Sequence, residues 1–108
     1  MDERRYAWLP EPDLADLEIG GILQALADPV RLQIVRLLDS AGEGSCSTLD
    51  LPVKPSTVSH HLRALRESGL VATRIDGTAR FSRLRRDDLE RRFPGLLDAV
   101  LKAKPARG

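Results

Sequence analysis

The sequence is poor in cysteine and lacks long apolar runs. Its single cysteine, Cys46, cannot form a disulfide within the chain, and such cysteine usage fits a reducing compartment. No apolar run approaches the roughly 20 residues needed to cross a bilayer. The opening stretch MDERRYAWLPEPD contains charges and prolines instead of an apolar signal region. These absences predict a cytoplasmic protein that does not associate with membranes.

The composition fits one small globular domain. Apolar residues make up 42% and charged residues 31% of the 108 positions, which is enough for a single modest core. Two prolines and the lack of a hydrophobic period predict a loose arm over residues 1–12. We expect a folded domain over residues 13–104 and a short tail over residues 105–108.

Positive charge is concentrated in the middle of the chain. Residues 54–86 hold eight Lys/Arg and only two Asp/Glu, whereas residues 1–53 hold four Lys/Arg and ten Asp/Glu. The formal net charge of +1 hides this separation. A basic block in an otherwise acidic or neutral chain favours a phosphate-bearing partner over an ordinary solvated face.

Apolar periodicity and helix-end residues predict the order of the elements. Helical spacing predicts a first helix from Asp13 to Leu26, and Asp28-Pro29 is typical of the start of a second. The later elements are a very short helix at 46–51, a helix at 55–68, strands at 71–75 and 79–84 joined by a turn at 76–78, and a last helix within 89–101 that Pro94 kinks or splits near Phe93. The resulting order, α-α-α-α-β-β-α, is a mainly α fold with a small β-hairpin (α+β).

The helix predicted at residues 55–68 has two distinct faces. Val58, Leu62 and Leu65 follow helical spacing and form its buried stripe, with His61 packed and hydrogen-bonded at the margin. The polar residues face elsewhere and are Ser56, Thr57, Ser59, His60 and Arg63. A short helix followed by a helix with such a polar face is typical of the helix-turn-helix, in which the second helix enters the DNA major groove.

The side chains of this polar face suit contact with double-stranded DNA. Ser56 and Thr57 can bond phosphates or base edges without holding the backbone away, and the free N–H groups at the helix start favour anions. Arg63 is suited to bidentate contact with guanine. The hairpin that follows carries Arg74, Arg80, Arg83 and Arg85, and we expect some of these to contact the sugar-phosphate backbone. The predicted DNA-binding residues are Lys54, Ser56, Thr57, Ser59, His60, Arg63, Arg74, Arg80 and Arg83.

Two stretches resemble one known family. LADPVRLQIVRLL and PSTVSHHLRALRESGLVATRIDGTARFSRL together resemble winged helix-turn-helix repressors of the ArsR/SmtB type, from about Leu26 to Leu84. The resemblance implies a bacterial transcriptional regulator, usually a repressor that an inducer releases, with its recognition helix at Pro55–Ser68. It implies no enzymatic activity.

The resemblance also implies a homodimer in which the first and last helices pair. The apolar stripes of these helices agree with it, and the predicted dimerisation residues are Leu14, Leu17, Leu23, Leu96, Leu97, Val100 and Leu101. A dimer would place two recognition helices about 34 Å apart, one DNA turn, on an inverted-repeat operator.

The ligand sets of metal-sensing relatives are missing. A site with two or more thiolates cannot form from Cys46 alone, and the last helical segment offers Asp87, Asp88, Glu90 and Asp98 but no histidine. We therefore predict no metal and no cofactor. Cys46 is either a small packed residue or a redox sensor near a helix start. The inducer, if it is a small molecule, is not identifiable from these residues.

Two other classes of protein fit the sequence less well than the regulator. An enzyme is disfavoured because both histidines lie side by side on the helix best suited to DNA, and no nucleophile, base and orienting acid can be assembled around them. A winged-helix module that binds protein is disfavoured by the excess of arginine over residues 54–86. The protein-binding module and a redox-responsive regulator remain as alternatives.

Overall fold

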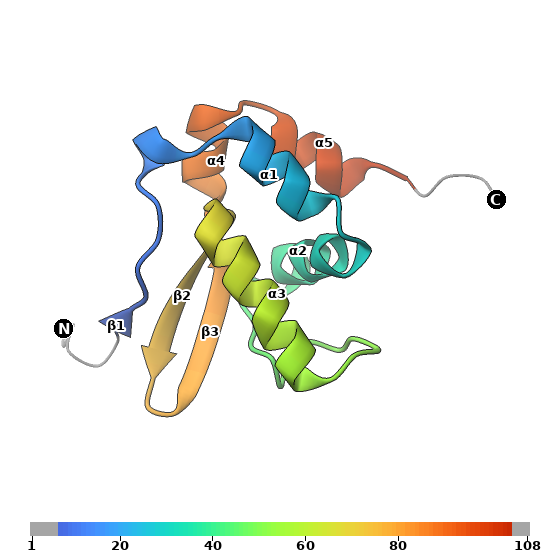
Figure 1. Cartoon of the computed structure of the whole chain (residues 1–108). Helices are drawn as coiled ribbons and strands as arrows, with labels where there is room; N and C mark the ends of the chain where they lie inside the picture. Colours follow the sequence, from blue (N-terminus) through green and yellow to red (C-terminus); the bar gives the residue numbers. More distant parts are fainter. Residues whose placement is uncertain (1–6, 105–108) are drawn as a thin grey trace.

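The computed structural model describes residues 7–104 and combines helices with one small sheet (Figure 1). Its elements, in chain order, are strand β1 (Ala7–Trp8), the 3-10 turn η2 (Leu14–Asp16), helices α1 (Ile19–Leu26), α2 (Pro29–Ala41) and α3 (Pro55–Ser68), strands β2 (Val71–Asp76) and β3 (Ala79–Leu84), and helices α4 (Arg86–Arg92) and α5 (Leu96–Lys102). This is the predicted α+β winged-helix architecture. The tail at residues 105–108 and the first six residues of the arm lie outside the described residues.

The hairpin β2–β3 forms as predicted, with a two-residue turn. Asp76 pairs with Ala79, and Gly77 at the turn has a φ of 63°, a conformation that glycine adopts without strain. The sheet is wider than predicted, because β1 pairs antiparallel with β2 and Gly44 forms a bridge to Ser82 of β3. The described end of the arm is thus an edge strand of the sheet.

The arm and the segment after it are held by three arginines. Arg66 of α3 donates to the carbonyl of Pro10, and Arg85 donates to the carbonyl of Pro12 at 2.7 Å. Arg92 of α4 donates to the carbonyls of Leu14 and Leu17. Figure 1 shows the result: the segment runs along the β2 side of the hairpin up to α4 and α1.

The first helix begins six residues later than predicted, at Ile19. Residues 14–16 form a single 3-10 turn, after which the extended backbone at Leu17 and Glu18 turns the Leu17 side chain into the core. The apolar spacing from Leu14 to Leu26 was therefore read as one helix although two segments produce it.

The short helix predicted at 46–51 is reduced to a single turn. The structure has one hydrogen-bonded turn there, in which the N–H groups of Thr48 and Leu49 donate to the carbonyl of Ser45. The hydroxyl of Thr48 accepts from the Ser45 N–H at 2.8 Å, which satisfies the start of the turn. Hydroxyl side chains that bond to nearby backbone compete with a regular helix.

The core lies where α1, α2 and α3 meet the hairpin. Val58, Leu62 and Leu65 of α3 are buried as predicted, and they join Ile34 and Leu38 of α2 in one cluster. The last helix is divided between α4 and α5, as the position of Pro94 predicted, and Gly95 (φ 81°) starts α5. Among residues 7–104, no helix is long and apolar enough to span a bilayer.

Candidate nucleic-acid interface

Helix α3 is delimited by residues that fix its ends. Pro55 occupies the first helical turn, where its missing N–H costs nothing, and Gly69 ends the helix in the left-handed conformation with a φ of 93°. Lys54 precedes the helix and is exposed, with no side-chain cap. The helix packs on α1, α2 and β2 through its apolar stripe, so its opposite face is open.

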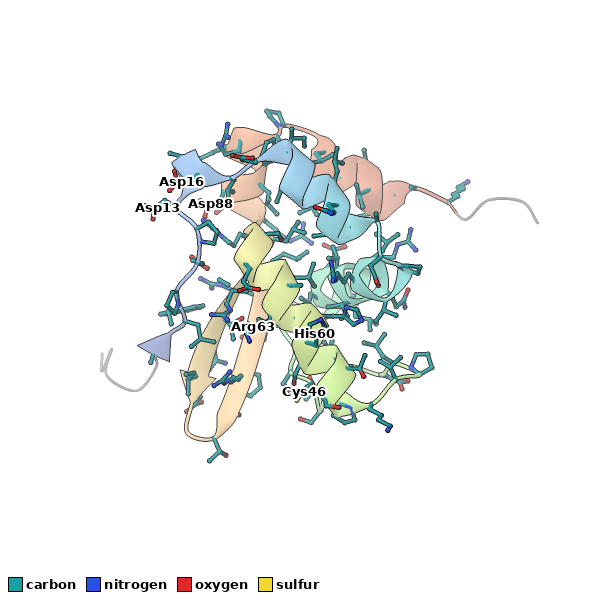
Figure 2. The ribbon with its side chains drawn as sticks, in the orientation of Figure 1. Asp13, Asp16, Cys46, His60, Arg63 and Asp88 are labelled. Atoms are coloured by element: carbon teal, nitrogen blue, oxygen red, sulfur yellow. The ribbon has the colours of Figure 1, made fainter. Side chains whose placement is uncertain are left out.

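The open face of α3 carries most of the predicted residues. Ser56, Ser59, His60 and Arg63 are exposed and lie on consecutive turns. Figure 2 shows His60 and Arg63 on neighbouring turns of α3, and Cys46 near the first turns of this helix. The Arg63 side chain is 70% exposed and pairs only loosely with Glu67, at 3.7 Å. An exposed i,i+4 pair of this kind is weak, so Arg63 can exchange Glu67 for another acceptor.

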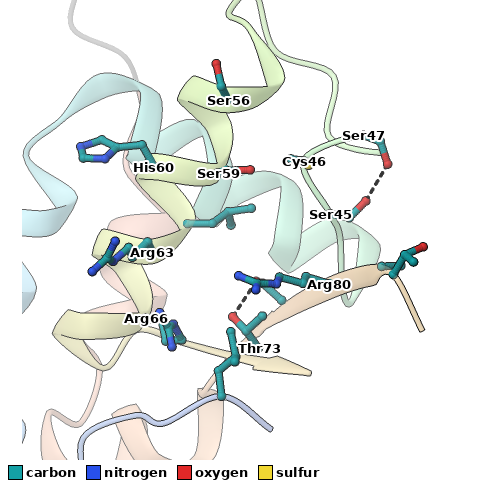
Figure 3. Close-up of a pocket in the computed structure, with 15 residues that line it drawn as sticks. Ser45, Cys46, Ser47, Ser56, Ser59, His60, Arg63, Arg66, Thr73 and Arg80 are labelled. Atoms are coloured by element: carbon teal, nitrogen blue, oxygen red, sulfur yellow. Dashed lines mark hydrogen bonds between the residues drawn. The ribbon is translucent and has the colours of Figure 1, made fainter. Parts of the chain in front are cut away.

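A groove of about 490 Å³ separates α3 from the hairpin (Figure 3). Its walls are α3, the strands β2 and β3, and the turn at residues 45–47. The lining is mostly polar and cationic: Leu9, Ser45, Cys46, Ser47, Ser56, Ser59, His60, Leu62, Arg63, Arg66, Thr73, Thr78, Ala79, Arg80 and Ser82. Figure 3 shows Ser59, Arg66 and Arg80 directed into the space between helix and strands, whereas the side chains of His60 and Arg63 extend from α3 away from the strands.

The floor of the groove is made by hydroxyl groups. Thr73 and Ser82 are paired residues of β2 and β3, and their side-chain oxygens lie 2.9 Å apart in a buried hydrogen bond. Arg80 is two residues before Ser82 and therefore shares its face of the strand. Among residues 7–104, Arg80 has no acidic partner. Its guanidinium is available to an external anion.

Two of the predicted hairpin arginines lie on the opposite face of the sheet. Arg74 is paired across the strands with Phe81, and alternation along β2 and β3 turns both away from α3. The Arg74 side chain is only 18% exposed, bonds Glu43 at 2.7 Å and lies 4.6 Å from the centre of the Phe81 ring. Arg83, on the same outer face, lies 4.6 Å from the ring centre of Trp8. Of the hairpin arginines, Arg80 therefore shares a face with the groove, whereas Arg74 and Arg83 lie on the other face of the sheet.

Arg85 is a structural residue rather than part of the exposed ribbon. Its side chain is 6% exposed and forms hydrogen bonds with Pro12 and Asp88. Arg85 thus ties the arm to α4. Its burial rules it out as a backbone contact in this conformation.

The remaining predicted residues lie at the margins of the groove. Thr57 is half-buried and does not line it, and Lys54 lies just before α3. Cys46 is half-buried in the groove wall. Within residues 7–104, no three His, Cys, Asp or Glu side chains gather in a way that could hold a metal ion.

Six polar residues of the groove were not predicted: Thr73 and Ser82 of the floor, and Ser45, Ser47, Arg66 and Thr78. Arg66 lies seven positions after Ser59, hence on the same helical face, and this spacing could have identified it. Thr78 in the hairpin turn and Ser45 and Ser47 in the preceding turn carry no comparable signal, because only the tertiary fold brings them to α3.

The predicted dimerisation residues are unevenly exposed. Leu17 is 1% exposed and belongs to the core of the single chain, so its side chain cannot contact a second protomer. Leu23 of α1 is 49% exposed, and Ile19, one turn earlier, is 44% exposed although it was not predicted. The others are half-buried and pack at the edge of the core: Leu14, Leu96, Leu97, Val100 and Leu101.

Comparison with known proteins agrees with this geometry. A family model described as a helix-turn-helix domain matches residues 26–74, which include α3 and the start of the hairpin. An uncharacterised HTH-type transcriptional regulator of Bacillus subtilis, YceK, is 38% identical over 88% of this chain and 98% of its own length. The arsenical resistance operon repressor of Staphylococcus xylosus is 34% identical over 68% of this chain and 71% of its own length. The biofilm growth-associated repressor of Agrobacterium fabrum is 34% identical over 82% and 76%.

The chain therefore belongs to the helix-turn-helix transcriptional regulators of the ArsR type. Members of this family act on transcription by binding DNA and are not enzymes. The α3 helix is the recognition helix of the motif, and the β2–β3 hairpin is its wing.

Proposed function

We propose that the protein is a repressor that binds a specific operator as a homodimer. The observation that carries the proposal is the cationic surface of α3 and the wing. Arg66 and Arg80 face the groove with its floor and wall of hydroxyl groups, and Arg63 is exposed on the adjoining face of α3. A DNA backbone seated in the groove would meet two guanidinium groups, while Ser56 and Arg63 face the bases in the major groove. His60 contacts DNA beside Arg63.

The dimer in this proposal forms through α1 and α5. Ile19 and Leu23 expose an apolar stripe on α1, and α5 adds Leu97 and Leu101 at its half-buried surface. Figure 1 places α1, α4 and α5 together at the end of the molecule away from the hairpin tip. Pairing through that end leaves both recognition helices free, which suits an inverted-repeat operator.

The proposal includes no metal and no cofactor for DNA binding. The protein would act in the cytoplasm, where its operator is, and a small-molecule inducer of unidentified chemistry would release it. Screening metals, oxidants and small hydrophobic compounds for release from DNA would identify the signal.

The test is selection of bound fragments from random DNA, followed by titration of the best fragment at several salt concentrations. We expect an inverted repeat and an affinity that falls log-linearly with salt, because each neutralised phosphate releases counterions. Flat salt dependence would instead favour a protein-binding module. Sedimentation that finds only monomer at tens of micromolar would remove the two-half-site arrangement.

A second candidate is a regulator that responds to oxidants through Cys46. The observation that favours it is the position of the thiol in the wall of the groove, beside the recognition helix. Oxidation of the sulfur would add bulk and charge there. Peroxide should then weaken DNA binding by the native protein but not by Cys46→Ser, and equal sensitivity of both proteins would reject this candidate.

A further inference from the structure

A direct hydrogen bond joins the recognition helix to α2. The Nε of Arg31 in α2 donates to the Nδ1 of His61 in α3, at 3.1 Å. An arginine nitrogen is always a donor, so the Nδ1 of His61 must accept and carries no proton. The imidazole in this conformation is therefore neutral, with its proton on Nε2.

His61 is placed between the buried and the DNA-facing sides of α3. It is half-buried at the margin of the apolar stripe, as expected from the sequence, and its ring lies edge-on to that of His60, with centroids 5.9 Å apart. His60 is exposed on the polar face and lines the groove. A change at His61 is thus one residue away from the DNA-binding surface.

The other charged groups around His61 come mainly from α2. Asp28 caps α2 by accepting from the N–H groups of Val30 and Arg31, and its carboxylate interacts electrostatically with His61. Helix α1, which also packs on α3, has no ionisable side chain. On β2, Arg74 and Asp76 lie on the outer face of the sheet and pair there. Lys54 lies seven residues before His61, about two helical turns away.

We propose that His61 is a positioning residue for the DNA-binding face of α3, and that protonation of its Nδ1 weakens DNA binding. The inference rests on the proposed function and adds its regulation by pH. A protonated Nδ1 would point a donor at the Nε–H of Arg31 and would place two positive charges together. The imidazolium would be repelled by Arg31 and attracted by the Asp28 carboxylate, whose Oδ1 caps α2 and whose Oδ2 is not used by the cap. The bond from Arg31 to His61 would then be lost, and α3 would move relative to α2.

The two adjacent histidines have opposite effects on DNA affinity. A protonated His60 adds positive charge at the groove and strengthens binding to phosphates as the pH falls. A protonated His61 loses its bond to Arg31 and weakens binding over the same range. The wild-type pH profile is the sum of both effects, so the test must separate them.

The experiment compares DNA affinity from about pH 8 to about pH 5.5, the range in which histidine titrates, at constant ionic strength. The proteins are wild type, His60→Asn, His61→Asn and the double variant. Asparagine at position 61 places an amide oxygen where Nδ1 lies, so it accepts from Arg31 without titrating. We expect His60→Asn to lose roughly threefold to tenfold in affinity on acidification, the size expected from the net loss of one hydrogen bond. The double variant should show no change.

An affinity of His60→Asn that stays constant or rises on acidification overturns the proposal, and so does a loss that persists in the double variant. Arg31→Met in the His60→Asn background is a further check, because it removes the donor and should flatten the profile.

A second readout does not require DNA. Imidazole ¹⁵N shifts should place the proton of neutral His61 on Nε2, and protonation should shift the backbone amides of Val30 and Arg31. If no variant binds DNA at any pH, the proposed function fails. The NMR shifts then show by themselves whether the hydrogen bond between Arg31 and His61 responds to protonation. Amides of α2 and α3 that do not respond to His61 protonation would overturn the inference.

Discussion

Leu17 lies against Gly69, the residue that ends the recognition helix, so closely that a Cβ at Gly69 would overlap the Leu17 side chain. The contact joins the segment before α1 to the C-terminus of α3. It explains why Leu17 leaves the helical pattern of its neighbours and enters the core. Gly69 serves two purposes: it adopts a φ of 93° and it makes room for Leu17.

Replacing Gly69 by alanine should therefore be costly. We expect Gly69→Ala to destabilise the fold by about 2–5 kcal/mol, from left-handed strain and overpacking together. Gly95→Ala is the matched control, because Gly95 is also left-handed, with a φ of 81°, but has nothing near its Cβ position, and it should cost only about 1–2 kcal/mol. Urea unfolding of both variants measures the difference. Equal costs would mean that Leu17 moves aside freely.

Arg63 and Arg80 should affect different properties of DNA binding, namely the sequence preference and the overall affinity. Arg63→Ala should reduce the preference for operator over random DNA by about 1–3 kcal/mol, because Arg63 faces the bases. Arg80→Ala should weaken binding to both DNAs about equally and lower the salt slope by about 1, because the proposed complex has Arg80 on a phosphate. Gel-shift titrations at two salt concentrations measure both quantities.

Arg83→Ala is the control for the wing. Arg83 lies on the outer face of the hairpin beside Trp8 and should affect DNA binding less than Arg80 does. If Arg63→Ala leaves the operator preference unchanged, its base-reading role is wrong. If Arg83→Ala equals Arg80→Ala, the outer face of the wing also contacts DNA.

The cap of α2 should make stability depend on pH in acid. The N–H of Arg31, helped by that of Val30, holds the pKa of the Asp28 carboxyl below its ordinary value of 3.8, against a partial burial that raises it. Since the folded-state pKa is the lower one, this stabilisation is complete above the ordinary value and is lost as the pH falls through the folded-state pKa. Asp28→Ala should cost about 0.5–2 kcal/mol near neutral pH.

Asp28→Asn separates the contribution of the capping hydrogen bonds to stability from the contribution of the carboxylate charge. The amide oxygen can still accept from the backbone, so most of the stability near neutral pH should remain, while the part that titrates in acid should disappear. Thermal unfolding as a function of pH compares the three proteins. An Asp28→Asn profile identical to that of the native protein would assign the acid sensitivity to other carboxylates.

The buried guanidinium of Arg85 should contribute to stability and not directly to DNA contact. Arg85→Met keeps most of the side-chain volume but removes the hydrogen bonds to Pro12 and Asp88, and we expect a loss of about 2 kcal/mol. Arg91→Met, at an exposed position of α4, should change stability by less than about 0.5 kcal/mol. Chemical denaturation tests both. An Arg85→Met variant as stable as the native protein would show that other contacts hold the arm.

The parts of the fold that were predicted correctly depend on local signals. Helix α3 lies between Pro55 and Gly69 with an unambiguous apolar stripe, and the hairpin has a turn sequence at its centre. Pro94 divides the last helix because proline cannot donate within it. In each case a residue acts on its immediate neighbours, so the sequence alone is informative.

The predictions from sequence fail where contacts between distant residues determine the local structure. Strand β1 forms because β2 offers it an edge, and Leu17 turns inward because Gly69 leaves space. The faces of Arg74 and Arg80 follow from the register of the hairpin and from the side on which α3 packs. The charge composition identified the basic region. It could not predict which of its arginines would line the groove, lie on the outer face of the sheet or form buried hydrogen bonds.

Each long side of the wing is partly covered by another segment of the chain. Residues 7–9 pair with β2, and Gly44 pairs with Ser82 of β3. Unpaired backbone N–H and C=O groups along a strand invite another chain to add a strand of its own, a common start of aggregation. These pairings interrupt both edges of the hairpin, so a strand from a neighbouring molecule finds no continuous edge to extend.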